Sequence, residues 1–455
     1  MFKERAKSRL IEFIKYDLQW AKRPVVWLSQ LRAWQLSVSN QHSRAFDIIS
    51  TTFRTGWPGS FSPAVNAARR IFKDAQNESI KELIIKENIN ATTALERTKK
   101  FFDDPENLFE GVIIILKSCS HEEKGVLLIK YSYYFPLFAK LFHWEAIADK
   151  YHIVLEPSWA GYCEKNILMY TALPGKVYVM TYEDRDAHFI NTINTNLKTV
   201  DVGPSWWVDH RQFKPSATKN RDIDILMIAA WADFKRHYQF FRAISELKKE
   251  GCEYKVVLAG YPGDKCMDDI KSMAKHFGVF EQTTFYEWIP PEHVSELMQR
   301  AKVNVLWSRF EGNNRSIIEG MFCGTPCILR EGHNYGQHYD YINPKTGILS
   351  SESALPKNLK YMVENYQRFS PRDYVLNHRS CEVATKKLND EIKANVISDG
   401  GVWNEGIVKK VNELHGMRYF NPEERQKFQG DYNFLASMIR KQYKSGRQPA
   451  PSSIN

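Results

Sequence analysis

Two glutamates with seven residues between them, Glu311 and Glu319, are the residues of this chain most suited to chemistry. They belong to the segment 308–326, which reads SRFEGNNRSIIEGMFCGTP. Carboxylates accept hydrogen bonds from hydroxyl groups, and Gly312 lets the backbone approach a ligand closely. The two asparagines that follow are good N-caps for a helix. Because the free N–H groups of a helix start favour phosphate, the segment predicts a site for a ligand with hydroxyl and phosphate groups.

The segments around this site alternate between strands and helices. The run 301–307 is apolar and β-rich, as expected for a buried parallel strand. Glycine and proline at 324 and 326 are typical of the end of the following helix. Further strands are predicted at 224–229, 255–259, 284–289 and 327–329, with helices after Lys235, at 267–277 and at 292–300. This alternation predicts a doubly wound parallel sheet that binds ligands beyond the carboxyl ends of its strands.

The first half of the chain carries a second, less regular α/β pattern. Residues to about 105 read as helical, and strands are predicted at 111–117, 152–155 and 176–181. A loop with a glycine, 118–125, follows the first of these strands, so His121 and Lys124 are candidates for a phosphate contact. The apolar run 126–142 contains two lysines and a proline. We interpret that run as a buried or interfacial helix that does not cross a bilayer.

The segment around the two glutamates resembles the carboxyl-terminal signature of the group 1 retaining glycosyltransferases of GT-B architecture. In that family a strand is followed by Ser-x-x-Glu-Gly, and later by a second Glu, a small residue, Met and Gly-Thr-Pro. The residues in matching positions are Ser308, Glu311, Gly312, Glu319, Met321, Gly324, Thr325 and Pro326. The resemblance extends from about 199 to 347, where the order of elements is that of the family.

The resemblance implies a role for each matching residue. Lys235 would lie on the donor diphosphate, where its ammonium neutralises phosphate charge. Glu319 would accept hydrogen bonds from the ribose hydroxyls, and Glu311 would hold a hydroxyl of the transferred sugar. Lys235 and Glu311 are therefore the expected catalytic residues. The remaining donor contacts would come from the loop and from a strand-end turn, at Gly312, Asn313, Asn314, Arg315 and Gly260.

Three positions depart from the family pattern, and one of them is the second loop glycine, which Asn313 or Asn314 replaces. Ala230 stands five positions before Lys235, where the family has an arginine. We expect Arg315 or Arg309 to supply the missing contact to the diphosphate. Glu287 occupies the place of a family glycine, so this sequence does not define the contacts to the base.

The resemblance implies a GT-B fold, an α/β architecture in which two Rossmann-like, doubly wound parallel-sheet domains face each other across a cleft. The expected parts are a helical amino-terminal extension (1–105), an acceptor domain (106–212), a nucleotide-sugar domain (213–380), and carboxyl-terminal helices with a polar tail (381–455). A chain of 455 residues is long enough for two domains.

The implied reaction moves a sugar from a nucleotide-sugar donor to a glycan, lipid-linked or other hydroxyl acceptor, as in polysaccharide biosynthesis. Configuration would be retained, with no metal or other cofactor. The alternative is a non-catalytic sugar-nucleotide-binding or scaffold protein of the same fold, which Ala230 and Glu287 favour. The sequence leaves the donor sugar, the base, the acceptor and the oligomeric state undefined.

A pair of aspartates, Asp184 and Asp186, supports a rival interpretation. Asp-x-Asp after a strand is the metal site of the other large glycosyltransferase architecture, in which a divalent ion bridges carboxylates and diphosphate. Asp222 and Asp224 share this spacing but lie at the beginning of a strand.

Composition points to an intracellular protein. The seven cysteines are scattered without a Cys-x-x-Cys pair, so we expect reduced thiols and no structural zinc. The first 20 residues carry charges throughout, so we expect no signal peptide. The formal net charge of +10 comes without a nucleic-acid recognition motif. We therefore expect a cytoplasmic protein that does not bind nucleic acid.

The basic, tryptophan-bearing amino-terminal segment has two open interpretations. Residues 22–34 read KRPVVWLSQLRAW, in which apolar residues alternate with bases. Segments of this kind lie on anionic lipid, which would make the protein peripheral on a membrane. The other interpretation is a helix that packs on the core of the protein itself.

Overall fold

The computed structural model describes residues 10, 13–14, 18–217, 220–332 and 339–443. The chain forms two compact units. Unit 1 consists of Met1–Val202 together with Thr385–Asn455, and unit 2 consists of Gly203–Ala384.

Unit 1 begins with a helical extension. Its elements are α2 (Gln19–Val38), α3 (His42–Arg54), α4 (Phe61–Phe72), η2 (Ala75–Asn77), α5 (Glu78–Ala91), α6 (Lys99–Asp103) and η3 (Pro105–Phe109). Aromatic packing joins α3 to α4, since the rings of Phe46 and Phe72 meet edge to face at 5.5 Å. The Ser50 hydroxyl of α3 donates to the Cys163 carbonyl, and Lys165 pairs with Asp47 at 2.9 Å. The extension is thus fastened to the α/β part of the unit.

The unit 1 sheet has five strands in the order in which they occur in the chain. They are β1 (Ile113–Lys117), β2 (Gly125–Lys130), β3 (Tyr151–Glu156), β4 (Val177–Thr181) and β5 (Leu197–Asp201). Strands β2 to β5 are parallel, whereas β1 pairs with β2 in the antiparallel direction. The hairpin needs Gly125, because a Cβ there would lie 2.6 Å from the Lys117 carbonyl oxygen.

Helices connect these strands, and the end of the chain completes the unit. The connections contain η4 (Ser132–Tyr134), α7 (Phe135–Leu141), α8 (Trp144–Lys150), α9 (Lys165–Leu168), η5 (Met169–Ala172) and α10 (Asp184–Ile193). From Thr385 the chain adds most of α17 (Cys381–Ser398), then β12 (Lys410–Asn412), β13 (Met417–Tyr419), α18 (Glu424–Lys427), α19 (Gln429–Ser437) and η9 (Lys441–Tyr443).

A buried charge cluster holds the carboxyl-terminal hairpin to the sheet. Glu156, at the end of β3, accepts hydrogen bonds from Lys410 Nζ at 2.7 Å and from the Asn412 amide at 2.8 Å. Lys130 Nζ lies 3.9 Å from the same carboxylate. All four side chains are buried. Burial opposes ionisation of Glu156, but the two lysines outweigh it and hold the pKa of its carboxyl below the usual value.

The unit 2 sheet has six strands in the order β11-β10-β9-β6-β7-β8. They are β6 (Ile223–Ile228), β7 (Val256–Gly260), β8 (Thr283–Glu287), β9 (Ala301–Leu306), β10 (Cys327–Arg330) and β11 (Gly347–Ser350), all parallel. The chain builds outward from β6 in one direction and from β9 in the other. The order therefore reverses between β6 and β9, which makes this pair the topological switch point.

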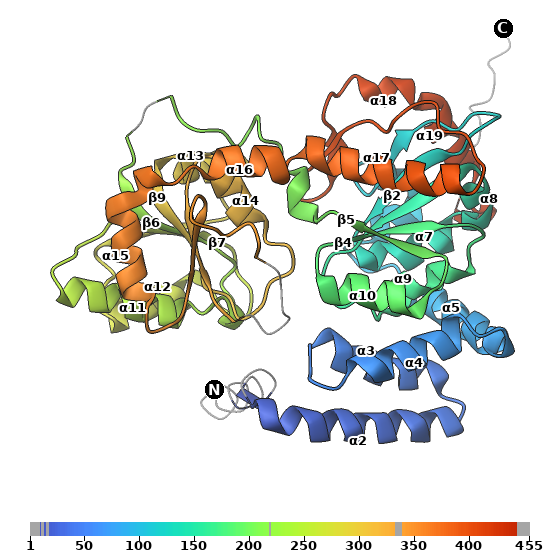
Figure 1. The fold of residues 1–455 in the computed structure, drawn as a ribbon, viewed down its shortest axis with the longest axis horizontal. Coiled ribbons are helices and arrows are strands. Elements are labelled where there is room, and N and C mark those ends of the chain that lie inside the picture. Colours follow the sequence, from blue (N-terminus) through green and yellow to red (C-terminus); the bar gives the residue numbers. More distant parts are fainter. Residues whose placement is uncertain (1–9, 11–12, 15–17, 218–219, 333–338, 444–455) are drawn as a thin grey trace, which may run out of the picture. The chain divides into compact units, whose positions relative to one another are not determined.

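Helices cover both faces of the unit 2 sheet (Figure 1). One face carries α11 (His237–Lys249), α12 (Met267–His276) and α15 (Leu355–Asn365), and the other carries α13 (Pro291–Arg300), α14 (Arg315–Phe322) and α16 (Pro371–His378). The short 3-10 helices of the unit are η6 (Pro204–Trp207), η7 (Asp233–Lys235) and η8 (Tyr366–Arg368). A doubly wound sheet with two apolar faces accounts for the near-continuous hydrophobic runs of its strands.

The predicted fold class is confirmed: the chain contains two Rossmann-like α/β sheets and a helical amino-terminal region. The doubly wound strand order belongs to unit 2, whereas the strands of unit 1 follow sequence order.

Two predictions for unit 1 are wrong. The run 126–142 is not one helix but contains β2 and α7, because its first residues, Val126 to Lys130, pair with β1 and β3. The loop 118–125, which carries His121 and Lys124, connects an antiparallel hairpin. It therefore lies at the amino ends of the parallel strands, whereas phosphate sites of such sheets lie at the carboxyl ends.

Among the described helices, none combines the length and the apolar character needed to span a bilayer.

The buried cluster gives a test of unit 1. Lys410→Met removes one partner of the Glu156 carboxylate, and we predict that it lowers the free energy of unfolding by about 3–5 kcal/mol. Lys386→Met is the matched control, because Lys386 forms an exposed ion pair with Asp390 on α17, which is worth about 1 kcal/mol or less. Urea unfolding followed by circular dichroism measures both. Equal losses in the two variants would contradict the role assigned to the cluster.

Candidate functional site

The switch point of unit 2 brings two loops together. One follows β6 and runs to η7, and the other joins β9 to α14. The Arg309 amide donates to the Phe234 carbonyl at 2.8 Å, and the rings of Phe234 and Phe310 stack at 4.8 Å. The loops at the carboxyl ends of β6 and β9 therefore lie side by side. Open α/β sheets bind their ligands at this edge.

A buried ion pair lies at this surface. Lys235 Nζ, from the end of η7, is 2.5 Å from Glu311 Oε1. The Ser308 hydroxyl donates to the same carboxylate oxygen, and the Phe234 ring lies 4.9 Å from the ammonium. Lys235 and Glu311 are only 8% and 4% exposed. The two residues that the sequence singled out for chemistry are thus brought into direct contact, in fixed positions.

The second glutamate is held by an arginine of its own helix. Arg315 Nε lies 2.5 Å from Glu319 Oε1, one turn along α14. Asn314 is the N-cap, since its side-chain oxygen accepts from the Ile317 amide at 3.1 Å. A carboxylate beside a guanidinium at the start of a helix is suited to bind a ligand that has hydroxyls next to an anionic group.

The helix is seated close to β9 by a small residue. Gly320 packs against Asn304, because a Cβ at Gly320 would lie 2.8 Å from the Asn304 amide nitrogen. That amide in turn donates to the Ser316 carbonyl at 3.0 Å. The small residue after Glu319 therefore lets α14 approach the strand.

Asn313 has a structural partner. Its side-chain oxygen accepts from the Ser205 amide at 2.5 Å, and a Cβ at Gly203 would lie 2.7 Å from its amide nitrogen. Asn313 thus joins the site loop to the segment that begins unit 2. Gly312 is buried in the same loop.

Gly260 and Glu287 lie at the ends of the neighbouring strands. A Cβ at Gly260 would lie 2.1 Å from the Ala229 carbonyl oxygen, so only glycine allows β6 and β7 to approach here. Glu287 accepts from the Trp231 indole nitrogen at 2.8 Å. The residue that replaces the family glycine is therefore engaged in holding Trp231.

The sequence did not identify three residues that shape the site. Phe234 and Phe310 stack beneath the ion pair, and Arg236 takes a left-handed conformation with φ of 59°. Arg236 binds Glu352 and is buried. Aromatic residues next to Lys235 and Glu311 in otherwise polar loops were the available signal for the stacked pair.

The aspartates of the rival metal interpretation are engaged elsewhere. Asp186 is buried and accepts from the Gly161 amide at 2.7 Å and the Tyr162 amide at 3.0 Å. Asp222 pairs with Arg300 at 2.7 Å, and Asp224 with Lys302 at 2.6 Å. These contacts give the carboxylates structural roles.

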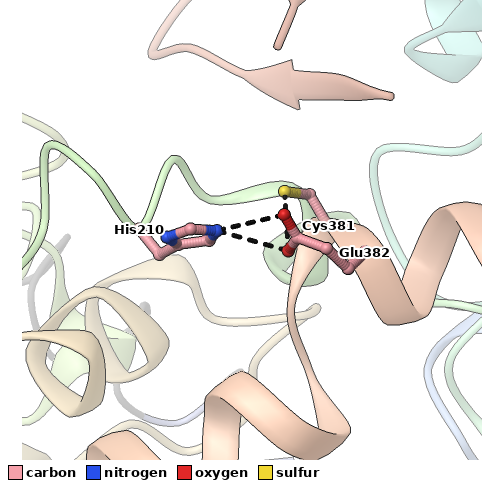
Figure 2. Close-up of side chains that lie close together, drawn as sticks. All are labelled: His210, Cys381 and Glu382. Atoms are coloured by element: carbon pink, nitrogen blue, oxygen red, sulfur yellow. Dashed lines mark hydrogen bonds and ion pairs between the residues drawn. The ribbon is translucent and has the colours of Figure 1, made fainter. Parts of the chain in front are cut away.

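One group of side chains in the described residues could enclose a metal ion: His210, Cys381 and Glu382 (Figure 2). His210 Nε2 lies 3.3 Å and 3.2 Å from the two carboxylate oxygens of Glu382. Cys381 Sγ donates to Glu382 at 3.3 Å. Three ligand atoms are fewer than a structural zinc takes. The contacts fasten the segment after η6 to the start of α17.

Exposed aromatic side chains mark the carboxyl edge of the unit 1 sheet. Tyr131, directly after β2, has φ of 71°, and its ring stacks on Tyr133 at 5.5 Å. The Ser132 and Ser158 amides each donate to the hydroxyl of the other serine at 3.1 Å, which ties the loops after β2 and β3 together. Tyr133 and Trp159 remain exposed on these loops. Strain at a strand end is typical of functional loops.

Comparison with known proteins agrees with the geometry of unit 2. Residues 208–369 match the model of the glycosyl transferases group 1. The match supports a glycosyltransferase, and it confirms the predicted resemblance to group 1 for this part of the chain. No curated protein matches the chain in sequence.

Several solved structures resemble the chain at low identity. Sucrose-phosphate synthase (tll1590) from Thermosynechococcus elongatus is 14% identical, with 60% of this chain and 73% of that chain covered and a TM-score of 0.45. A mutant of S. aureus TarM, in complex with fondaparinux, alpha-GlcNAc-glycerol and UDP, is 15% identical, with 57% and 54% covered and a TM-score of 0.46. Anabaena Alr3699/HepE in complex with UDP is 11% identical, with 59% and 78% covered and a TM-score of 0.46.

Proposed function

We propose that this protein is a retaining glycosyltransferase that moves a sugar from a nucleotide-sugar donor to a hydroxyl acceptor. The observation that carries the proposal is the buried contact between Lys235 and Glu311 at the switch point of unit 2. It lies in the region that matches the glycosyl transferases group 1.

The proposed roles follow from the chemistry of each group. Departure of the diphosphate is the costly event, because negative charge grows on its oxygens. The Lys235 ammonium and the amino terminus of α14 would stabilise that charge. Glu311 would hold a hydroxyl of the sugar while it keeps the ammonium in position. Glu319 would bind the ribose, with support from the backbone at Gly260, Gly312 and Asn313–Asn314.

We propose that unit 1 binds the acceptor through the loops at the carboxyl ends of its parallel strands. Exposed tyrosine and tryptophan rings are suited to stack on sugar rings, so Tyr133 and Trp159 favour a glycan or lipid-linked glycan. Polysaccharide biosynthesis is the process that such an acceptor indicates.

Turnover of a donor panel tests the function. We predict that Lys235→Met and Glu311→Gln each lower nucleoside diphosphate release by about 10²–10³-fold, because each removes a preplaced charge. The panel combines UDP-, GDP- and ADP-sugars with glycan and lipid-linked acceptors, and the anomeric configuration of the product is read by NMR. Turnover should survive a chelator, since no step uses a metal.

Lys302→Met is the matched control, because Lys302 pairs with Asp224 on the same sheet and should leave turnover unchanged. The double variant Lys235→Met/Glu311→Gln avoids a lone buried charge and separates misfolding from loss of chemistry. If several donors bind to the unmodified protein but none turns over, the protein is a scaffold that kept the fold.

Arg315 is proposed as the replacement for the arginine missing at Ala230. Arg315 already lies beside Glu319, so its guanidinium could also donate hydrogen bonds to a diphosphate. We predict that Arg315→Ala weakens nucleoside diphosphate binding at least tenfold in calorimetric titration, by loss of a charge-assisted hydrogen bond. Arg300→Ala, at an exposed ion pair of the same unit, is the control. If the Arg315→Ala variant binds nucleoside diphosphate as tightly as the control, Arg315 does not have this role and Arg309 becomes the candidate.

We further propose that α2 places the protein on anionic membranes. The helix turns Val26, Ala33 and Leu36 inward. Its outward face carries three tryptophans at intervals of seven residues, Trp20, Trp27 and Trp34, which are 77%, 63% and 62% exposed. The helix thus has an apolar face that packs on the protein and a second, tryptophan-rich face that is exposed.

Charge favours lipid as the partner of this face. The α2 sequence contains no acidic residue, and Arg23 and Arg32 are exposed on it. Tryptophan is enriched at the membrane interface, where arginine also pairs with anionic headgroups. The formal net charge of +10 also favours binding to anionic lipid.

Vesicle sedimentation tests the membrane proposal. We predict that the unmodified protein binds vesicles with anionic lipid, and that replacing Trp20, Trp27 and Trp34 together by Ala lowers the partition coefficient at least tenfold, because the buried aromatic area is lost. Trp288→Ala is the matched control, an exposed tryptophan of unit 2. Equal binding of the triple variant, or a protein dimer that this variant abolishes, would contradict the proposal.

A further inference from the structure

Three side chains that can ligate a metal converge in unit 2, at a place that the proposed reaction does not use. His210 comes from the segment after η6, and Cys381 and Glu382 begin α17 (Figure 2). An imidazole nitrogen, a thiol sulfur and a carboxylate oxygen all lie within 4.8 Å of one another. In the part of the chain that the structure describes, this is the one group of its kind. Two segments that are distant in sequence thus bring three donors together.

The spacing of these donors matches that of ligands around a tetrahedral ion. Bonds from zinc to nitrogen, oxygen and sulfur measure about 2.0–2.3 Å, so neighbouring ligand atoms stand roughly 3.3–3.7 Å apart. Here His210 Nε2 lies 3.2 Å and 3.3 Å from the two carboxylate oxygens of Glu382. Cys381 Sγ lies 3.3 Å from the same carboxylate. An ion could therefore replace the thiol proton that now joins sulfur to oxygen, because the donors already have the required spacing.

The donor set selects the class of metal. A thiolate together with an imidazole suits Zn²⁺ or Co²⁺, whereas Mg²⁺ and Ca²⁺ prefer oxygen ligands. Three protein ligands are the number found in a zinc site that keeps one position for water, and not in a closed structural site. Water can reach that position, because the side chains of His210 and Glu382 are 19% and 43% exposed. Cys381 is buried and is the innermost donor.

The charges of this group suit a divalent cation. On binding, the Cys381 thiol releases its proton, and the thiolate and the Glu382 carboxylate then neutralise the two positive charges of the ion. Arg211 is near enough for its charge to act on both residues. Two hydrogen bonds of 2.9 Å join its guanidinium to Asp209, so this pair adds no net charge. Cations that flank Cys381 in sequence also have carboxylate partners, in the pairs Arg379–Asp340, Lys386–Asp390 and Lys387–Asp201.

We propose that His210, Cys381 and Glu382 form a zinc site with an open fourth position. Gly203 begins unit 2 and Ala384 ends it, so the ligands lie on the two segments through which the chain enters and leaves this unit. The ion would link these segments and so stabilise unit 2. No step of the proposed sugar transfer uses the site, so the failure of one proposal leaves the other unaffected.

Cobalt titration of the reduced, metal-free protein tests the site. One Co²⁺ should bind per chain, with the visible absorption of a tetrahedral ion and a cobalt–thiolate charge-transfer band, and Zn²⁺ should displace it. Cys381→Ser should abolish the charge-transfer band. His210→Gln and Glu382→Gln should each weaken binding at least about tenfold, since even the partner of a ligand contributes about 10–100-fold to metal affinity.

Cys266→Ser is the matched control. Cys266 is an exposed thiol that also donates to a carboxylate, that of Asp269 at 3.3 Å. It belongs to no group of three donors among the described residues. This variant should keep the charge-transfer band and the affinity of the unmodified protein. Glu311→Gln should bind zinc equally well, whether or not the protein transfers sugar.

Thermal unfolding gives a second measurement. Zn²⁺ should raise the melting temperature of the unmodified protein, because it binds the folded state, and should raise that of Glu382→Gln less. The Glu382 side chain is exposed, so this variant keeps the test decisive if Cys381→Ser fails to fold. Three results would overturn the zinc site: no tetrahedral cobalt binding, a charge-transfer band that survives Cys381→Ser, or unchanged affinity in the His210→Gln and Glu382→Gln variants.

Discussion

The buried ion pair between Lys235 and Glu311 is the interaction on which the candidate site depends. Removing two charges from water is expensive, and their attraction repays this only with good geometry and further hydrogen bonds. Ser308 supplies one such bond, and the Phe234 ring lies against the ammonium. Because a buried pair is weak evidence for stability, its presence at the ligand-binding edge of the sheet favours a chemical role.

Strand order explains how two residues 76 positions apart come into contact. Strands β6 and β9 are neighbours only because the sheet is wound in two directions from the middle. The loops at their carboxyl ends then meet, and the stacked pair of Phe234 and Phe310 fixes their spacing. The same edge receives the start of α14, which Asn314 caps. Rigid elements thus hold each functional side chain, and the loops add only the last few residues.

Much of unit 2 could be predicted from sequence because its signals are local. The strand before Ser308, the asparagine cap and the glycine stop all lie within one short segment, and the family signature placed Glu311 and Glu319 within it. The contacts that the site residues make could not be predicted in this way. Pairing of Arg315 with Glu319 competes with other rotamers, and the contact of Asn313 with Ser205 spans 108 positions. Such contacts depend on tertiary packing.

Unit 1 was harder to predict from sequence, because its elements also depend on tertiary packing. An apolar run such as 126–142 fits a buried strand or a buried helix equally well, and only its partners β1 and β3 decide between them. The antiparallel direction of β1 also has no local signal. Because β1 is antiparallel to β2, the loop with Lys124 lies at the amino ends of the parallel strands and not at their carboxyl ends. The direction of one strand therefore changes the interpretation of the whole loop.

The late return of the chain to unit 1 has a consequence for biosynthesis. Lys410 lies 254 positions after Glu156, and all of unit 2 stands between them. As the ribosome extends the nascent chain, unit 2 is complete before the carboxyl-terminal strands that finish unit 1 have emerged. Until then, Lys130 is the one cationic neighbour that the described residues give to Glu156. Unit 1 is therefore the first to begin and the last to be finished. A messenger cut short after unit 2 would yield a complete unit 2 joined to an unfinished unit 1.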